Sequence, residues 1–223
     1  MDAKSWIFEE RKITLKEGVF REYLSSCREQ LWPEWERRGA SVLCLLCGHM
    51  GESPLDLVQM ARFPDLPVWQ ESQMALVDRE NTLVEREDVR LMRSIVGSRP
   101  KIPLSLDDHH PVYGYRRFFI KPADIEEVSQ LSENGVWPRF ESHGCKVLGL
   151  WTPLAITPSQ EVLLITGYGS LAHWEETRLG QDMPKDFDPE LWERGREAAI
   201  RRRDLISQSW VSMMRAIYLE GQS

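Results

Sequence analysis

Three side chains in the second half of the sequence could together carry out acid/base chemistry on a carbonyl compound. They are Arg116, Tyr168 and His173. Imidazole transfers protons well near neutral pH, a tyrosine hydroxyl can donate a hydrogen bond to a developing oxyanion, and a guanidinium can bind a carboxylate or an enolate. This is the minimal set for such a reaction without a cofactor. The alternative is structural: His173 caps or packs in the first turn of a helix, and Tyr168 is an ordinary strand residue.

A further pair of charged residues lies near the start of the sequence. Glu9 and Arg11 are two residues apart, so their side chains share one face of a strand. We expect Arg11 and Glu9, together with Trp174, to contribute to ligand binding. The alternative for the pair is an internal salt bridge shared by both halves, because Arg116 occupies the position equivalent to Arg11.

That equivalence comes from a repeat with a period of 105 residues. The segment Trp32–Gly39, WPEWERRG, returns as Trp137–Gly144, WPRFESHG, and the same offset pairs Arg11 with Arg116. A two-fold repeat of this length indicates two copies of a small domain, fused so that each covers the open face of the other. We therefore expect one unit at residues 1–97, a linker at 98–111 and a second unit at 112–223.

Each copy is expected to run strand, helix, strand, strand, helix. In the first copy we expect strands at 6–15, 41–47 and 55–63, a helix that ends at Gly39, and helical residues from 66 to about 96. In the second we expect strands at 112–120, 146–152 and 161–168, a helix from about 123 to Gly144, and a terminal helix at 189–219. Pro33 should kink or restart the first helix, and both glycines should adopt positive φ. The order indicates an α+β fold of two ferredoxin-like units, each a four-stranded sheet with helices on one face.

Composition limits the classes of partner. The formal charge is −7, with 42% hydrophobic and 28% charged residues, and the basic clusters are short and dispersed. A negative chain is not attracted to phosphate backbones or anionic lipid, so we expect neither nucleic acid nor membrane as a partner. The first residues lack the order of a signal peptide, and no apolar run approaches a membrane span. We expect a cytoplasmic protein.

Two motifs have the composition of metal sites, but neither has the required geometry. Cys44 and Cys47 lie three residues apart in a strand, so their sulfur atoms should point to opposite faces of a sheet. The run Asp107-Asp108-His109-His110 lies in the expected linker, without fixed spacing on a helix or strand. We expect no metal site.

Two segments resemble one protein family. Ile7–Gly18, IFEERKITLKEG, is similar to the opening strand and turn of NIPSNAP domains, and Gly167–Arg178, GYGSLAHWEETR, resembles the family's third strand and following helix. The resemblance implies the fold of the dimeric α/β barrel superfamily, here with both sheets in one chain. The two halves depart from each other: Phe63 stands at the offset of Tyr168, and Gly114 at that of Glu9.

The fold superfamily includes cofactor-free cyclases, isomerases and monooxygenases, haem enzymes, and proteins without known catalysis. From the resemblance we expect a barrel that binds a small, partly apolar organic molecule and acts on it by cofactor-free acid/base chemistry, as a cyclase, isomerase or dehydratase in biosynthesis. The alternatives are a non-enzymatic protein that binds a ligand or a protein partner, and a haem-binding protein that uses His173. A homo-oligomer is compatible with each of them.

Overall fold

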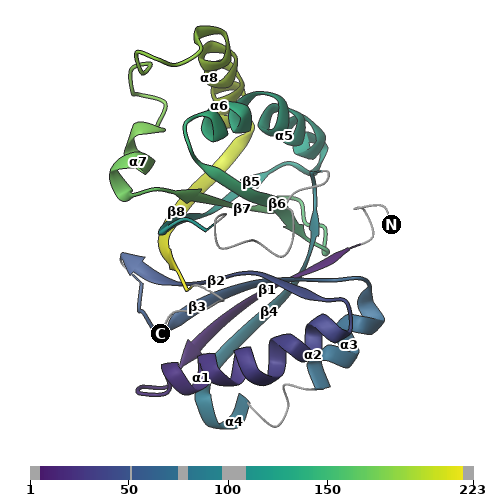
Figure 1. The fold of residues 1–223 in the computed structure, drawn as a ribbon. Helices are drawn as coiled ribbons and strands as arrows, with labels where there is room; N and C mark the ends of the chain where they lie inside the picture. Colours follow the sequence, from purple (N-terminus) through teal and green to yellow (C-terminus); the bar gives the residue numbers. More distant parts are fainter. Residues whose placement is uncertain (1–5, 51, 75–79, 97–108, 218–223) are drawn as a thin grey trace.

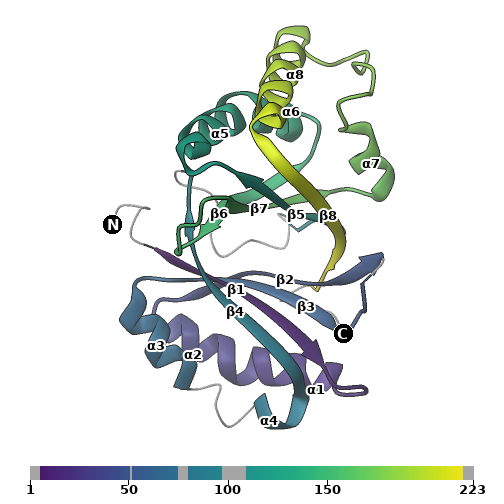
Figure 2. The same ribbon diagram turned by 180° about the vertical axis from the view of Figure 1, so that it is seen from behind.

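The chain forms an eight-stranded barrel with helices on its two outer faces. The computed structural model describes residues 6–50, 52–74, 80–96 and 109–217. Two four-stranded antiparallel sheets face each other across the barrel interior, and each sheet carries its helices on the side away from the other (Figure 1). The view from behind shows the same layers, helix, sheet, sheet, helix (Figure 2).

The first half is a complete ferredoxin-like unit. Its strand order is β4-β1-β3-β2, with every pair antiparallel. Its elements are β1 (Ile7–Leu15), α1 (Phe20–Ser26), a π-helical turn (Cys27–Leu31), α2 (Trp32–Arg37), β2 (Ser41–Met50), β3 (Asp56–Phe63), α3 (Leu66–Met74), α4 (Glu80–Leu83) and β4 (Val84–Ser94).

The second half repeats this arrangement with the strand order β8-β5-β7-β6. Its elements are β5 (Val112–Ile120), a 3-10 turn (Pro122–Asp124), α5 (Ile125–Leu131), a π-helical turn (Ser132–Val136), α6 (Trp137–Ser142), β6 (Lys146–Pro153), β7 (Gln160–Tyr168), α7 (Leu171–Glu176), α8 (Pro189–Asp204) and β8 (Ile206–Ala216). The offset of 105 residues holds from β1 and β5 through α3 and α7. It rises to 122 between β4 and β8, because the long helix α8 has no equal among the described residues of the first half.

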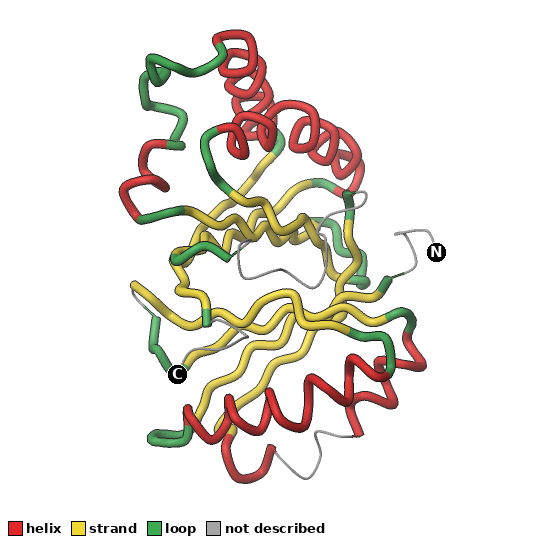
Figure 3. The backbone as a smooth tube through the Cα atoms, in the orientation of Figure 1, coloured by secondary structure: helices red, strands yellow, loops and turns green. Residues whose placement is uncertain are grey.

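The two sheets close into one barrel along two seams. Strand β2 pairs with β8, and β4 pairs with β6, both antiparallel. The tube in Figure 3 shows the two sheets lying across from each other with the helices outside. The expected fold class, two tandem ferredoxin-like units that form a barrel of the dimeric α/β type, is confirmed.

The expectation for the last strand of each unit was wrong. Residues 84–94 and 206–216, which we expected to be helical, are strands β4 and β8. Charged and polar residues predominate in β4, and in β8 Ile206, Trp210 and Met213 follow a spacing that also fits a helix. Long-range pairing decides the conformation: β4 bonds to β1 along almost its whole length, and β8 does the same with β5. Of the expected linker at 98–111, residues 98–108 lie outside the described part of the chain.

The helix breaks and turns follow from proline and glycine. Pro33 and Pro138 lack an N–H group and stand in the first turn of α2 and α6, each directly after a π-helical turn, so the predicted restart of the helix is confirmed. Gly39 and Gly144 both have φ of +81°, as expected for residues that end a helix. None of the helices in the described residues is long and apolar enough to cross a lipid bilayer.

Three apolar cores hold the layers together. One fills the barrel between the sheets, and one lies between each sheet and its helices. Cys44 belongs to the core inside the barrel and Cys47 to the core beneath the helices of the first half, so the prediction that they face opposite sides of the sheet is confirmed. Both cysteines are buried, as are Cys27 and Cys145, and none of the four forms a disulfide within the described residues.

Candidate functional site

A cavity of about 480 Å³ lies between the second sheet and its helices. We call it the helix-side cavity. Its walls come from β5, β7 and β8, from α6 to α8, and from the segment between α7 and α8. The lining combines apolar and cationic side chains, including Phe118, Phe140, Leu164, Trp174, Ile206, Arg116, Arg139, Arg178, Arg202 and Arg203.

Three of the residues predicted from the sequence meet in this cavity: Arg116, Tyr168 and Trp174. Alternation along β5 directs Arg116 toward the helices, while its neighbours Tyr115 and Arg117 line the barrel interior. The Nη1 atom of Arg116 donates a 3.3 Å hydrogen bond to Ser209 Oγ on β8. Trp174 reaches the cavity from α7, and the guanidinium of Arg178 lies 4.9 Å from the centre of its ring.

Tyr168 supplies a neutral hydroxyl. The residue lies at the end of β7 with 5% of its surface exposed, and burial raises the pKa of its hydroxyl to about 12. At neutral pH the group is therefore protonated and can donate a hydrogen bond. Its ring lies over Gly114, since a Cβ atom on that glycine would be 3.2 Å from the ring. The glycine at the place of Glu9 thus makes room for a tyrosine in the second half.

His173 lies beside the cavity and is absent from its described lining. Its ring joins the start of α7 to the end of α6: Nδ1 accepts a 3.0 Å hydrogen bond from Gly169 N–H, and Nε2 lies 2.7 Å from the carbonyl oxygen of His143. Its backbone N–H donates to Ser170 Oγ, the N-cap of α7. Both ring nitrogens are engaged, so this geometry favours neither proton transfer nor ligation of a haem iron by His173.

Arg139, which was not predicted from the sequence, enters the cavity from α6. The residue is 3% exposed, and its guanidinium lies 4.8 Å from the centre of the Trp192 ring. Its Nη2 atom donates a 3.0 Å bond to the Thr177 carbonyl, whereas its Nε atom is buried without a hydrogen-bond partner in the described residues. The repeat contained a signal for this residue: the equivalent position in the first half is Glu34, so the charge changes from negative to positive between the two copies.

Arg202 of α8 was missed as well. Its Nη1 atom donates a 3.1 Å hydrogen bond to Ser132 Oγ. Burial, followed by the positive charge of Arg116, lowers the pKa of Arg202 to about 10. Burial followed by the charge of Arg178 lowers the pKa of Arg116 as well. No signal in the repeat marks Arg202, because the described residues of the first half contain no counterpart of α8.

Arg11 and Glu9 lie in the corresponding place of the first half, where they form a closed network. Arg11 Nε bonds to Glu9 Oε1 at 2.7 Å, and Arg11 Nη1 lies 2.7 Å from Glu87 Oε1 on β4. Trp69 and Gln73 of α3 also donate to Glu9. Both members of the pair are buried, and neither belongs to the described lining of the helix-side cavity. The arrangement is that of an internal salt bridge.

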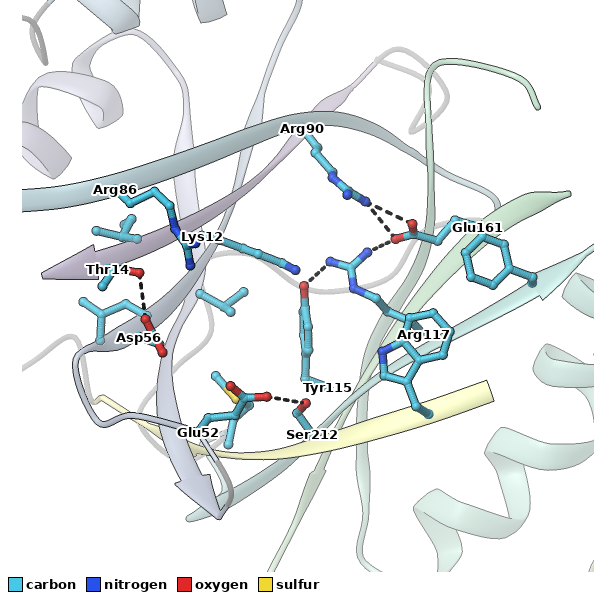
Figure 4. Close-up of a pocket in the computed structure, with 16 residues that line it drawn as sticks. Lys12, Thr14, Glu52, Asp56, Arg86, Arg90, Tyr115, Arg117, Glu161 and Ser212 are labelled. Carbon is cyan, nitrogen blue, oxygen red and sulfur yellow. Dashed lines mark hydrogen bonds and ion pairs between the residues drawn. The ribbon is translucent and has the colours of Figure 1, made fainter. Parts of the chain in front are cut away.

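A second cavity, of about 370 Å³, opens between the two sheets and is called the inter-sheet cavity. Figure 4 shows Lys12 of β1 reaching across it toward Tyr115 of β5. Arg117 binds the buried Glu10 from the opposite sheet, and also Tyr115 and Glu161. The positive and negative side chains here neutralise one another in a network that ties the halves together.

The comparisons with known proteins agree with the fold. The NIPSNAP family model matches residues 113–206. A putative monooxygenase from Lactobacillus acidophilus has a TM-score of 0.64 at 14% identity, over 95% of this chain and 94% of that one. An anthrone oxidase-like protein has a TM-score of 0.63 at 10% identity, over 98% and 94% of the two chains.

A chlorite dismutase variant from Candidatus Nitrospira defluvii is a more distant structural neighbour. Its TM-score is 0.58 at 9% identity, over 98% of this chain and 92% of that one. None of the curated proteins matches the sequence. At these identities the structural neighbours establish the fold alone, and the family match covers the half that contains the helix-side cavity. Residues 113–206 are therefore a NIPSNAP-family region within a single-chain barrel of the dimeric α/β type.

Proposed function

We propose that this protein binds a small, partly apolar organic molecule in the helix-side cavity. The observation that carries the proposal is the contrast between the halves. In the second half, Arg116, Tyr168 and Trp174 line an open space with apolar walls. In the first half, the equivalent Arg11 is closed in by Glu9 and Glu87. A pocket of this size with a few convergent polar groups is the usual form of a small-molecule site.

A fluorescent probe tests the proposal directly. N-phenyl-1-naphthylamine is neutral and apolar, and its emission rises when it leaves water. Ala199 of α8 is buried in the cavity wall, so Ala199→Phe should fill part of the space and weaken probe binding about tenfold or more. Ala172 of α7 is exposed and absent from the described lining, which makes Ala172→Phe the matched control. Equal binding by the two variants would remove the proposal.

Cofactor-free acid/base catalysis in the same cavity is a second candidate. Two side chains of the lining favour it. The neutral hydroxyl of Tyr168 can donate a hydrogen bond to the oxygen of a developing enolate, and the positive charge of Arg116 can stabilise the negative charge of that enolate. In this version His173 holds the end of α6 in place and takes no part in proton transfer. The described lining contains no carboxylate or imidazole, so a solvent hydroxide ion takes the proton from the carbon and becomes water, and the enolate held by Tyr168 and Arg116 later takes a deuteron from the solvent. Phenylpyruvate, an enolisable 2-oxo acid, is a suitable probe, with deuterium exchange at its methylene carbon measured by NMR. Tyr168→Phe should then slow enzyme-dependent exchange about 10²-fold with binding retained. A protein that binds phenylpyruvate without accelerating exchange is a binding protein.

A further inference from the structure

We infer that the ligand of the helix-side cavity is an organic anion, with a carboxylate, sulfonate or phosphate group held by Arg116, Arg139 and Arg202. The inference rests on the proposed function and specifies the chemical class of its ligand. Three independent features of the site support it: the charge of its lining, the exchange of residues between the two halves, and the engagement of each guanidinium.

The lining of the cavity has a single sign of charge. Five arginines contribute to it, and the described lining contains no aspartate or glutamate. Within the described residues, Arg116, Arg139 and Arg202 form no ion pair, although each is at least partly buried. Buried charges in proteins are normally paired, because an unpaired charge loses its hydration without compensation. An anionic ligand would supply the missing counter-charge.

The repeat shows which carboxylates the second half lacks. In the first half Arg11 is neutralised by Glu9 of the same strand and by Glu87 of β4. The offset of 105 residues makes Gly114 the equivalent of Glu9. Strand register gives the equivalent of Glu87: Arg11 is aligned with Val89 on β4 and Arg116 with Val211 on β8, and Ser209 precedes Val211 by two residues as Glu87 precedes Val89. Both acids are therefore replaced by uncharged residues while the arginine remains.

Two other positions change in the same direction. At the offset of 105 residues, Glu34 of α2 corresponds to Arg139 of α6, and Gln73 of α3 corresponds to Arg178. Glu34 pairs with Arg38 in the first half, and no such acid belongs to the described lining of the second-half cavity. Four exchanges between equivalent positions each make the second half more positive. This pattern is what an anion site requires.

The three guanidinium groups make few hydrogen bonds within the protein, so some of their N–H groups can still donate to a ligand. Arg139 uses Nη2 for a carbonyl and keeps a buried Nε without a partner in the described residues. Arg116 and Arg202 each bond one serine hydroxyl, a neutral and weak acceptor for a guanidinium. A guanidinium has five N–H donors in a planar fork that matches carboxylate and phosphate oxygens. The neutral Tyr168 hydroxyl is a further donor in the same lining.

The remainder of the lining describes the rest of the ligand. Phe118, Phe140, Leu164 and Ile206 form apolar walls next to the arginines. A fully hydrated inorganic anion would leave these walls unused, and a neutral hydrocarbon would leave the arginines unpaired. The combination favours a molecule with an anionic group at one end and an apolar body.

Two probes that differ by one anionic group test the inference. 8-Anilinonaphthalene-1-sulfonate has the ring system of N-phenyl-1-naphthylamine plus a sulfonate. We expect the sulfonate to bind about tenfold tighter or more at low salt and to lose that advantage as salt rises. If the neutral probe binds at least as well as the sulfonate, the anion inference fails while the proposed function stands. If neither binds in a manner sensitive to Ala199→Phe, the proposed function itself fails.

A substitution that restores the first-half pattern gives the sharpest test. Ser209→Glu places a carboxylate where Glu87 stands in the first half, within reach of Arg116. It should weaken sulfonate binding about tenfold or more without weakening the neutral probe to the same extent. Ser209→Gln adds similar volume without charge, so the difference between the two variants isolates the effect of charge. Thermal unfolding of both variants shows that they are folded, and equal sulfonate affinities of the two would overturn the inference.

An arginine pair completes the test. Arg116→Gln should weaken sulfonate binding by a similar factor, whereas Arg201→Gln removes an exposed arginine that is paired with Glu127 outside the described lining of the cavity. Equal losses in the two variants would mean that the probe senses overall charge, and the assignment to the cavity would be wrong.

Discussion

Glu10 should be among the most important charged residues for the stability of the barrel. The residue lies on β1 with its side chain fully buried, and it accepts hydrogen bonds from Tyr115 and Arg117 of the opposite half. Glu10→Gln keeps the shape and removes the charge. Arg117, which is 4% exposed, then loses one of its two carboxylate partners and keeps Glu161.

The expected cost follows from these contacts. Removing one partner of a buried ion pair costs about 3–5 kcal/mol. Because Glu161 continues to pair with Arg117, we expect the lower end, about 3 kcal/mol, a large share of the usual ~5–15 kcal/mol stability of a domain. The second oxygen, Oε2, has no hydrogen-bond partner in the described residues, so the glutamine amide would also bury an unsatisfied donor.

Urea unfolding followed by tryptophan fluorescence measures this change as a shift in midpoint at constant slope. The control is Glu127→Gln, which breaks the exposed pair with Arg201 and should shift the midpoint far less than Glu10→Gln does. A Glu10→Gln protein as stable as this control would refute the reasoning, because it would show that the link between the halves contributes little to stability.

Three further outcomes are expected. Burial favours the neutral form of Glu10, but the hydrogen bond and the charge of Arg117 outweigh it and lower the pKa of Glu10 below the ordinary 4.5. The contribution of the ionised Glu10 to stability is therefore complete above pH 4.5 and is lost as the pH falls through the lowered pKa. In urea titrations between about pH 5 and pH 3, the wild type should accordingly lose more stability than Glu10→Gln. Gly39→Ala and Gly144→Ala should each cost about 1 kcal/mol in the same assay because both residues have positive φ, and unchanged midpoints would contradict this. His173→Ala should lower the thermal midpoint, because it removes the two hydrogen bonds that the ring makes to Gly169 N–H and to the His143 carbonyl, while sulfonate binding stays within about threefold; loss of binding in a folded variant would return His173 to the site.

The sequence was sufficient for the two-unit repeat and for six of the eight strands, because the repeat is carried by residues with firm structural roles. Pro33, Gly39 and their partners Pro138 and Gly144 fix where helices restart and end, and apolar runs mark the central strands. The edge strands β4 and β8 could not be identified in this way. Their residues are mostly charged or partly exposed, so their conformation depends on pairing with strands far away in the sequence.

The candidate site was predicted in part for a similar reason. Arg116, Tyr168 and Trp174 meet because β5 and β7 are paired neighbours in the sheet of a ferredoxin-like unit, and α7 directly follows β7. Arg202 reaches the same cavity from α8, whose position over the sheet depends on packing that no local pattern describes. The role of His173 depended on its carbonyl partner in a distant turn, which spacing along the chain does not reveal.

The pairing of β8 has a consequence for the order of events during synthesis. This strand follows the other seven strands of the barrel in the chain, and it bonds to both β5 and β2. As the nascent chain leaves the ribosome, the first sheet can therefore form with β2 and β4 as open edges and with its inner apolar face in water. Open edges of this kind invite pairing with other chains. The interval before residues 206–216 emerge is thus the period in which the growing polypeptide is most exposed to aggregation and most in need of a chaperone.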